Sequence, residues 1–140
     1  MWVIDTCIVL DILENDPEFG RASAQLLQKL LPQGLSISPI TMVELSVAFS
    51  GDIIEQKHFL DQAGISYVEA WTAADTERAC TAWNFYIVAK RQAQTPQRPV
   101  ADILIGGFAA NRSGLVTRNT RDFKRWYPLL KIIEPSAKMP

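Results

Sequence analysis

Cysteine and histidine are scarce in this sequence of 140 residues, which has two cysteines and one histidine. Cys7 and Cys80 form no CxxC pair and no cysteine–histidine ligand set, which argues against a zinc site and a disulfide framework. A single histidine, His58, excludes a ribonuclease site built on two histidines, and we expect it on a helix surface. Cysteines without a pairing pattern are typical of a reduced, cytoplasmic protein.

Long apolar runs and several enzyme motifs are also absent. No stretch approaches the roughly 20 apolar residues of a membrane-spanning helix. The first residues, MWVIDTCIVLDIL, lack a basic segment and include two aspartates, so we expect no signal peptide. The absence of GxSxG and GxxxxGK[ST] argues against a serine hydrolase and a P-loop enzyme. A DxD pair, which a phosphohydrolase on a similar sheet would carry, is missing too.

Charge is balanced overall but divided between the two halves of the chain. The net charge of −1 combines −7 in residues 1–70 with +6 in residues 71–140. Five basic residues fall between Arg112 and Arg125. A local basic patch on a nearly neutral protein can bind a polyanion. A solvated helix face would give the same pattern, so charge leaves both interpretations open.

Apolar runs and helix signals alternate along the chain. We expect strands over residues 1–4, 35–38, 66–69 and 115–117, with a possible fifth over 131–134. We expect helices over residues 7–14, 16–31, 41–49, 52–63, 74–91 and 100–112, and a loop over 92–99. This alternation predicts a single α/β domain over residues 1–140, with a mostly parallel sheet of four to five strands and helices on both faces. Ligands of such sheets bind outside the carboxyl ends of the strands.

Three acidic residues stand alone in apolar surroundings. Asp5 follows the first expected strand, Glu44 is the only charge in residues 40–49, and Asp102 is the only charge in residues 100–110. A buried carboxylate without a partner is costly, so each of them needs one. Right-handed crossovers bring all three to the ligand edge, with Glu44 and Asp102 in the first turns of their helices. Oxygen ligands of this kind favour Mg²⁺ or Mn²⁺.

Each acid also has a purely structural explanation. Thr41-Met42-Val43-Glu44 fits a capping box, and Asp102 can complement a helix N-terminus. Asp5 can cap the helix that starts near Cys7. One shared partner accounts for the three acids together better than three unrelated helix ends do.

Four segments carry a family resemblance. They are Val3-Ile4-Asp5-Thr6, Thr41-Met42-Val43-Glu44-Leu45, Val100-Ala101-Asp102-Ile103-Leu104-Ile105 and Thr117-Arg118-Asn119-Thr120-Arg121-Asp122-Phe123. Their order and spacing, over the whole chain, resemble the PIN domain, and specifically the VapC-type toxins of bacterial toxin–antitoxin pairs. The resemblance implies a PIN-like fold and a metal-dependent endoribonuclease that uses Mg²⁺ or Mn²⁺. It also implies an RNA substrate, a homodimer and an antitoxin whose tail covers the active groove.

The resemblance assigns the acidic site to Asp5, Glu44 and Asp102. Phosphodiester hydrolysis needs an activated water, a stabilised phosphate and a neutralised leaving oxygen, which divalent ions can supply. We expect Asp5 and Asp102 to be the principal metal ligands. Glu44 would bind a second metal or orient the attacking water.

The remaining expected site residues are polar or basic. Thr6 and Thr117 would support the acids, and Arg118 and Arg121 would hold RNA phosphates. Many members of the family have an acid where this chain has Asn119.

Asp122 is the other candidate for that metal-ligand position, unless it only caps a helix or pairs with a nearby arginine. No motif that reads bases is visible. The alternative function is a degenerate PIN domain that binds RNA or protein without cleavage.

Overall fold

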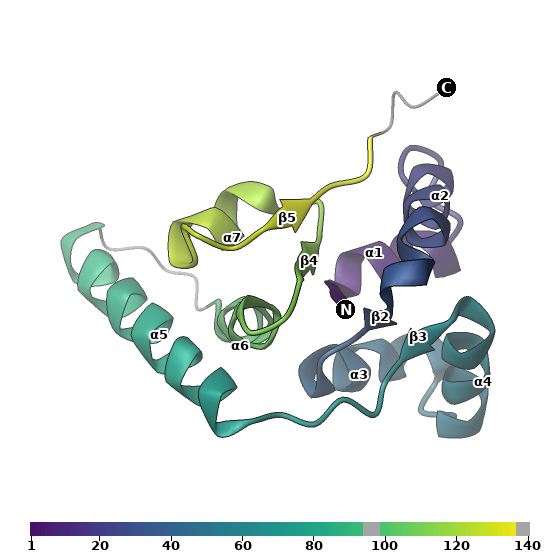
Figure 1. The fold of residues 1–140 in the computed structure, drawn as a ribbon, viewed down its shortest axis with the longest axis horizontal. Coiled ribbons are helices and arrows are strands. Elements are labelled where there is room, and N and C mark those ends of the chain that lie inside the picture. The colour runs from purple at the N-terminus through teal and green to yellow at the C-terminus, as the bar shows by residue number, and fades with distance from the viewer. Residues whose placement is uncertain (94–98, 137–140) are drawn as a thin grey trace.

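The computed structural model describes residues 1–93 and 99–136 and centres on a parallel sheet (Figure 1). The five strands pair in the order β3-β2-β1-β4-β5, and each neighbouring pair is parallel. They are β1 (Trp2–Ile4), β2 (Leu35–Ser36), β3 (Ile65–Ser66), β4 (Gly114–Val116) and β5 (Ile132–Ile133). The expected α/β fold with a parallel sheet is therefore confirmed, with strands shorter than the sequence predicts.

Helices connect the strands in the described part of the chain. They are α1 (Thr6–Leu13), α2 (Gly20–Leu30), α3 (Pro39–Leu45), α4 (Ile53–Ala63), α5 (Ala73–Ala93), α6 (Val100–Ala110) and α7 (Thr120–Trp126), with 3₁₀ turns η1 (Leu31–Gln33) and η2 (Ser46–Phe49). The expected loop over 92–99 lies mostly outside the described residues. None of the described helices is long and apolar enough to cross a membrane.

Two hydrophobic cores lie on opposite faces of the sheet, because successive side chains of each strand point to opposite sides. Val3 of β1 and Leu115 of β4 pack with buried residues of α5, α6 and α7. The next residues, Ile4 and Val116, pack on the opposite face with residues of α1, α2, α3 and α4. Successive strand residues point to opposite faces, so each short strand serves both cores. Helices therefore cover both faces of the sheet, and α5 runs beside α6 on one of them (Figure 1).

The segment before α2 corrects one expected helix start. Asp16 and Pro17 begin a turn, and the helix starts only at Gly20. The Asp16 carboxylate accepts hydrogen bonds from the backbone N–H groups of Glu18 at 2.9 Å and Phe19 at 2.8 Å. An aspartate that binds backbone N–H groups two and three residues ahead stabilises a turn as readily as a helix start.

Candidate functional site

Asp5 and Thr117 leave neighbouring strands side by side. Strands β1 and β4 pair with Ile4 opposite Val116, so the next residue of each strand reaches the carboxyl edge of the sheet together. The Thr117 hydroxyl donates a hydrogen bond to Oδ2 of Asp5 over 2.6 Å, and the backbone N–H of Thr6 donates to Oδ1 over 2.8 Å. Asp5, only 5% exposed, is thus buried and held by a donor on each carboxylate oxygen.

Asp5 is also the N-cap of α1, which confirms its structural explanation and leaves its second carboxylate oxygen at the carboxyl edge of the sheet. Burial raises the pKa of the Asp5 carboxyl, and the negative charge of Glu44 raises it further. Hydrogen bonds from Thr117, Cys7 and Thr6 oppose that rise. Hydrogen-bond donors around Asp5 therefore offset part of the cost of burying its charged carboxylate.

Cys7 is a neighbour of Asp5 that the sequence did not single out. Its Sγ lies 3.4 Å from Oδ2 of Asp5. Burial, followed by the charge of Asp5, raises the pKa of the Cys7 thiol to about 11. Cys7 therefore remains a protonated thiol that donates weakly to the carboxylate.

Glu44 occupies a different helical position from the one predicted. Helix α3 starts at Pro39, with Ser38 as N-cap, and the Ser38 hydroxyl accepts from the backbone N–H of Thr41 over 3.1 Å. Glu44 is therefore in the second turn, and the capping-box interpretation is wrong. It is also exposed rather than buried. The Thr6 hydroxyl donates to Glu44 Oε1 over 2.7 Å, which brings Glu44 to the same edge as Asp5.

Asp102 lies in the first turn of α6 and is half-buried. The pKa of its carboxyl is raised to about 6, first by burial and then by the charges of Asp5, Glu44 and Asp122, in that order. Charges act on one another in this way only at short range, because salt and water screen distant pairs. The structure therefore brings Asp5 from the end of β1, Glu44 from α3 and Asp102 from α6 close enough for their charges to interact, and the charge of Asp122 has the smallest effect.

Asn119 and Asp122 both lie at the start of α7, a helix whose existence the sequence analysis left open. Asn119 is the N-cap residue, yet its side chain makes no capping bond. Its amide instead approaches Asp102, with Nδ2 3.5 Å from Oδ2, and its backbone N–H donates to the Thr117 hydroxyl over 2.9 Å. Asp122 is exposed in the first turn and is not the cap. The side chain of Asn119 thus contacts Asp102 directly, whereas Asp122 affects Asp102 through its charge.

The two arginines predicted to bind RNA lie in different environments. Arg118 forms a bidentate ion pair with Asp11, from Nε to Oδ2 over 2.6 Å and from Nη2 to Oδ1 over 3.0 Å. Arg121 is exposed, and no ion pair of its side chain occurs among the described residues. Asp11 was not predicted, although it is the only charge in the apolar segment TCIVLDIL. That is the same signal that identified Asp5, Glu44 and Asp102.

The donor set is suited to a hard cation, although it is not a preformed metal centre. Among residues 1–93 and 99–136, no three acidic, cysteine or histidine side chains already form a group that could hold a metal ion. Hydroxyl and amide groups of Thr6, Thr117 and Asn119 occupy carboxylate oxygens instead. Carboxylate, hydroxyl and amide oxygens are nevertheless the ligands that Mg²⁺ prefers. A cation would also offset the repulsion that, after burial, raises the pKa of Asp102.

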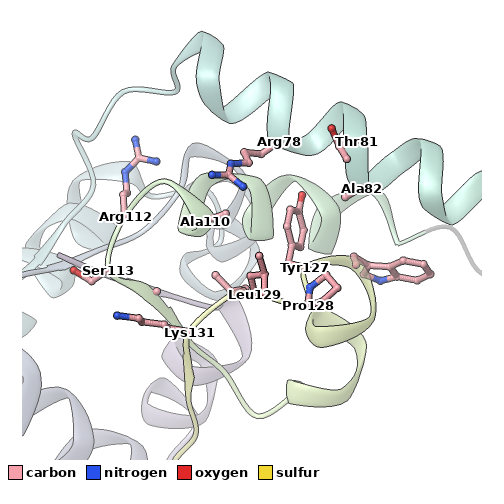
Figure 2. A pocket seen from close by; sticks show the side chains of 13 residues that line it. Arg78, Thr81, Ala82, Ala110, Arg112, Ser113, Tyr127, Pro128, Leu129 and Lys131 are labelled. Atoms are coloured by element: carbon pink, nitrogen blue, oxygen red, sulfur yellow. The ribbon is translucent and has the colours of Figure 1, made fainter.

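A cavity of about 480 Å³ lies at the opposite edge of the sheet. Figure 2 shows Arg78 and Thr81 of α5 above it, with Tyr127, Leu129 and Lys131 from the chain after α7. Its described lining includes three basic side chains and no carboxylate. It is therefore separate from the acidic site, which lies at the carboxyl ends of β1 and β4.

Solved structures with a similar fold cover nearly the whole chain. No protein-family model and no curated protein matches the sequence. A chain in the crystal structure of VapBC2 from Rickettsia felis bound to a DNA fragment from their promoter superposes with a TM-score of 0.70 and 20% identity, over 96% of this chain and 98% of that one. A chain in the 2.2 Å structure of VapBC-1 from nontypeable Haemophilus influenzae gives a TM-score of 0.64 and 20% identity, over 99% and 98%. The chain therefore has the PIN-like fold that its sequence predicts.

Proposed function

We propose that this chain is the toxin of a type II toxin–antitoxin system and a metal-dependent endoribonuclease that hydrolyses RNA phosphodiester bonds. One observation carries the proposal. Asp5, Glu44 and Asp102 come from three separate elements, and the charges of Asp5 and Glu44 both act on Asp102 at the carboxyl edge of the sheet. The fold on which they lie is that of chains in two VapBC structures.

Asp5 and Asp102 would hold the Mg²⁺ or Mn²⁺ ion, with Glu44 and Asp122 as further ligands. When bound, the divalent cation supplies an activated water and neutralises charge on the phosphate and the leaving oxygen. Thr117 fixes the orientation of Asp5 through its 2.6 Å hydrogen bond. Glu44 lies at the same edge and is exposed, so as an alternative to binding metal it would orient the attacking water.

The proposed partners are an RNA substrate, an antitoxin and a second copy of the chain. The exposed side chain of Arg121 would contact an RNA phosphate next to the acids. The two similar structures are both of VapBC, so we propose a cognate antitoxin as the protein partner. As the family resemblance implies, this antitoxin would cover the acidic edge and the toxin would be a homodimer. RNA substrate and antitoxin would meet the chain in the cytoplasm.

Cleavage of RNA by the purified chain tests the proposal. Total RNA should be cut in the presence of Mg²⁺ or Mn²⁺ and left intact in EDTA. Asp5→Asn, purified in the same way, is the control for contaminating nucleases and should not cut. Equal cleavage by the parent and by Asp5→Asn, or no cleavage by the parent with either ion, would overturn it.

A degenerate PIN domain that binds RNA or protein without cleavage is the second candidate. Two observations favour it: Asn119 stands where an acid is expected, and the described residues contain no preformed group of metal-binding side chains. Retained RNA binding, with no cleavage at any Mg²⁺ or Mn²⁺ concentration, would select this alternative.

A further inference from the structure

Two arginine–aspartate pairs lie at the two ends of strand β4. Arg112 precedes the strand, and its Nη1 lies 3.0 Å from Oδ1 of Asp75, which is fully buried. Arg118 follows the strand and pairs with Asp11, which is 5% exposed. A buried aspartate that loses its cationic partner is strongly destabilising. Each pair therefore fixes one end of β4 against a helix, α5 at the amino end and α1 at the carboxyl end.

The pair at the carboxyl end is tightly oriented. Both carboxylate oxygens of Asp11 accept from the Arg118 guanidinium, over 2.6 and 3.0 Å. The guanidinium carbon lies 4.5 Å from the centre of the Phe19 ring, which covers one of its faces. A bidentate contact fixes both the distance and the plane of an arginine, as a lysine contact would not. Arg118 is thus held as a structural group of the β4 exit.

The residues on either side of Arg118 are those that contact the acids. Thr117 donates to Asp5, the backbone N–H of Asn119 donates to Thr117, and the Asn119 amide approaches Asp102. Asp11 belongs to α1, whose first residue, Thr6, contacts both Asp5 and Glu44. The ion pair therefore joins the two segments that hold the acidic site from opposite sides.

We infer that Arg118 and Asp11 are positioning residues, which hold Thr117 and Asn119 against Asp5 and Asp102. This inference rests on the proposed ribonuclease function for its kinetic consequence and replaces the expectation that Arg118 contacts RNA phosphate. Misplacing a catalytic group by about 1 Å can cost about 100-fold in rate. Loss of the pair therefore lowers kcat, whereas loss of a phosphate contact raises KM.

Asp11→Asn and Arg118→Lys test the inference, with Asp75→Asn as the matched control at the other end of β4. On a defined RNA at a temperature where all variants are folded, we expect the first two to lower kcat about 10- to 100-fold with KM within about 2-fold of the parent. Asp75→Asn, which removes an equally buried acid far from the site, should lower the unfolding temperature while kcat stays within about 3-fold. Arg118→Lys keeps the charge, so it covers the case in which Asp11→Asn does not fold.

A second measurement separates this inference from the proposed function. The backbone N–H proton of Asn119 donates a hydrogen bond to the Thr117 hydroxyl. It should exchange with solvent faster in Asp11→Asn and Arg118→Lys than in Asp75→Asn. If the parent cuts no RNA, the proposed function fails, and the exchange result alone decides the positioning role. Unchanged Asn119 exchange in both variants, or a raised KM and a flatter salt dependence with normal kcat, would overturn the inference.

Discussion

The hydroxyl of Thr117 donates a hydrogen bond to Oδ2 of Asp5 over 2.6 Å, across 112 residues of sequence. The contact exists because β1 and β4 are neighbours in register, so the residue after each strand arrives at the same point of the sheet edge. It explains how a carboxylate that is 5% exposed stays oriented in an apolar setting. Together with the Thr6 backbone N–H, it gives each carboxylate oxygen of Asp5 a hydrogen-bond donor.

Asp5→Asn and Asp102→Asn should each abolish metal-dependent RNA cleavage while leaving the fold intact. The amide keeps the size of each side chain but removes the charge that would bind a cation. Cleavage rates with Mg²⁺, beside circular dichroism of the same samples, measure both effects. Full activity in either variant would refute the catalytic assignment.

The raised pKa of Asp102 predicts how stability depends on pH in the metal-free protein. Its pKa of about 6 exceeds the ordinary 3.8, so the folded state binds more protons than the unfolded state between those values. Stability from this group is therefore present below pH 4 and lost as the pH rises through 6. Asp102→Asn removes the loss and should be more stable than the parent at pH 7.5, by about 1 kcal/mol after allowance for solvent screening.

Urea unfolding of both proteins in EDTA, at pH 4.5 and pH 7.5, measures this difference. The advantage of Asp102→Asn should shrink at the lower pH, where the parent carboxyl is protonated. An advantage that is equal at both pH values would show that Asp102 carries no charge penalty in the fold.

The fold and most of the acids were predictable because both depend on local pattern. Lone charges in apolar runs identified Asp5 and Asp102, and alternating elements identified the parallel sheet. The error at Glu44 arose because Ser38-Pro39, an N-cap followed by proline at the first helical position, is a stronger helix start than Thr41. The N-cap lies at Ser38, three residues before Thr41, so Glu44 falls in the second turn of α3, where its side chain is exposed.

The pairing of Arg118 with Asp11 shows what the sequence could not provide. The two residues are 107 positions apart, and either could have faced solvent in an α/β fold. Only the packing of α1 against the end of β4 brings them together. The basic residues between Arg112 and Arg125 likewise look like one patch in sequence, yet β4 separates Arg112 from Arg118.

Arg121 is the better candidate for contact with RNA phosphate, because its side chain is exposed and outside the Arg118–Asp11 pair. Arg121→Ala should weaken RNA binding and lower the slope of log affinity against log salt by about 0.7 for one lost contact with a single strand. A salt titration with the Asp5→Asn protein as background prevents cleavage during the measurement. An unchanged slope would mean that Arg121 lies on a solvated helix face.

Helix α5 offers apolar surface for the proposed homodimer. Tyr86 of this helix is 2% exposed and belongs to the core, whereas its neighbour Phe85 is 54% exposed. Val88, one turn further along the same helix, is 47% exposed. We expect sedimentation at micromolar concentration to show a dimer, and Val88→Glu to shift it toward monomer. A parent that sediments only as a monomer would contradict the proposed assembly.

Asn119 decides how much negative charge the site can offer a cation. Its amide nitrogen lies 3.5 Å from Oδ2 of Asp102, so Asn119→Asp would place a second carboxylate beside one whose pKa is already raised. In the absence of metal, this added repulsion should lower the unfolding temperature. In the presence of Mg²⁺, the extra charge should strengthen binding, because ion affinity rises with ligand charge. Asn119→Asp should therefore keep activity, need less Mg²⁺ for half-maximal cleavage, and gain more thermal stability from Mg²⁺ than the parent does.

Asp122→Asn, which removes a more exposed charge, should reduce activity less than Asp5→Asn does. Cleavage rate and unfolding temperature measured against Mg²⁺ for the three variants test this. A higher Mg²⁺ requirement in Asn119→Asp would mean that negative charge does not limit the site, and that the amide itself is needed to hold Asp102.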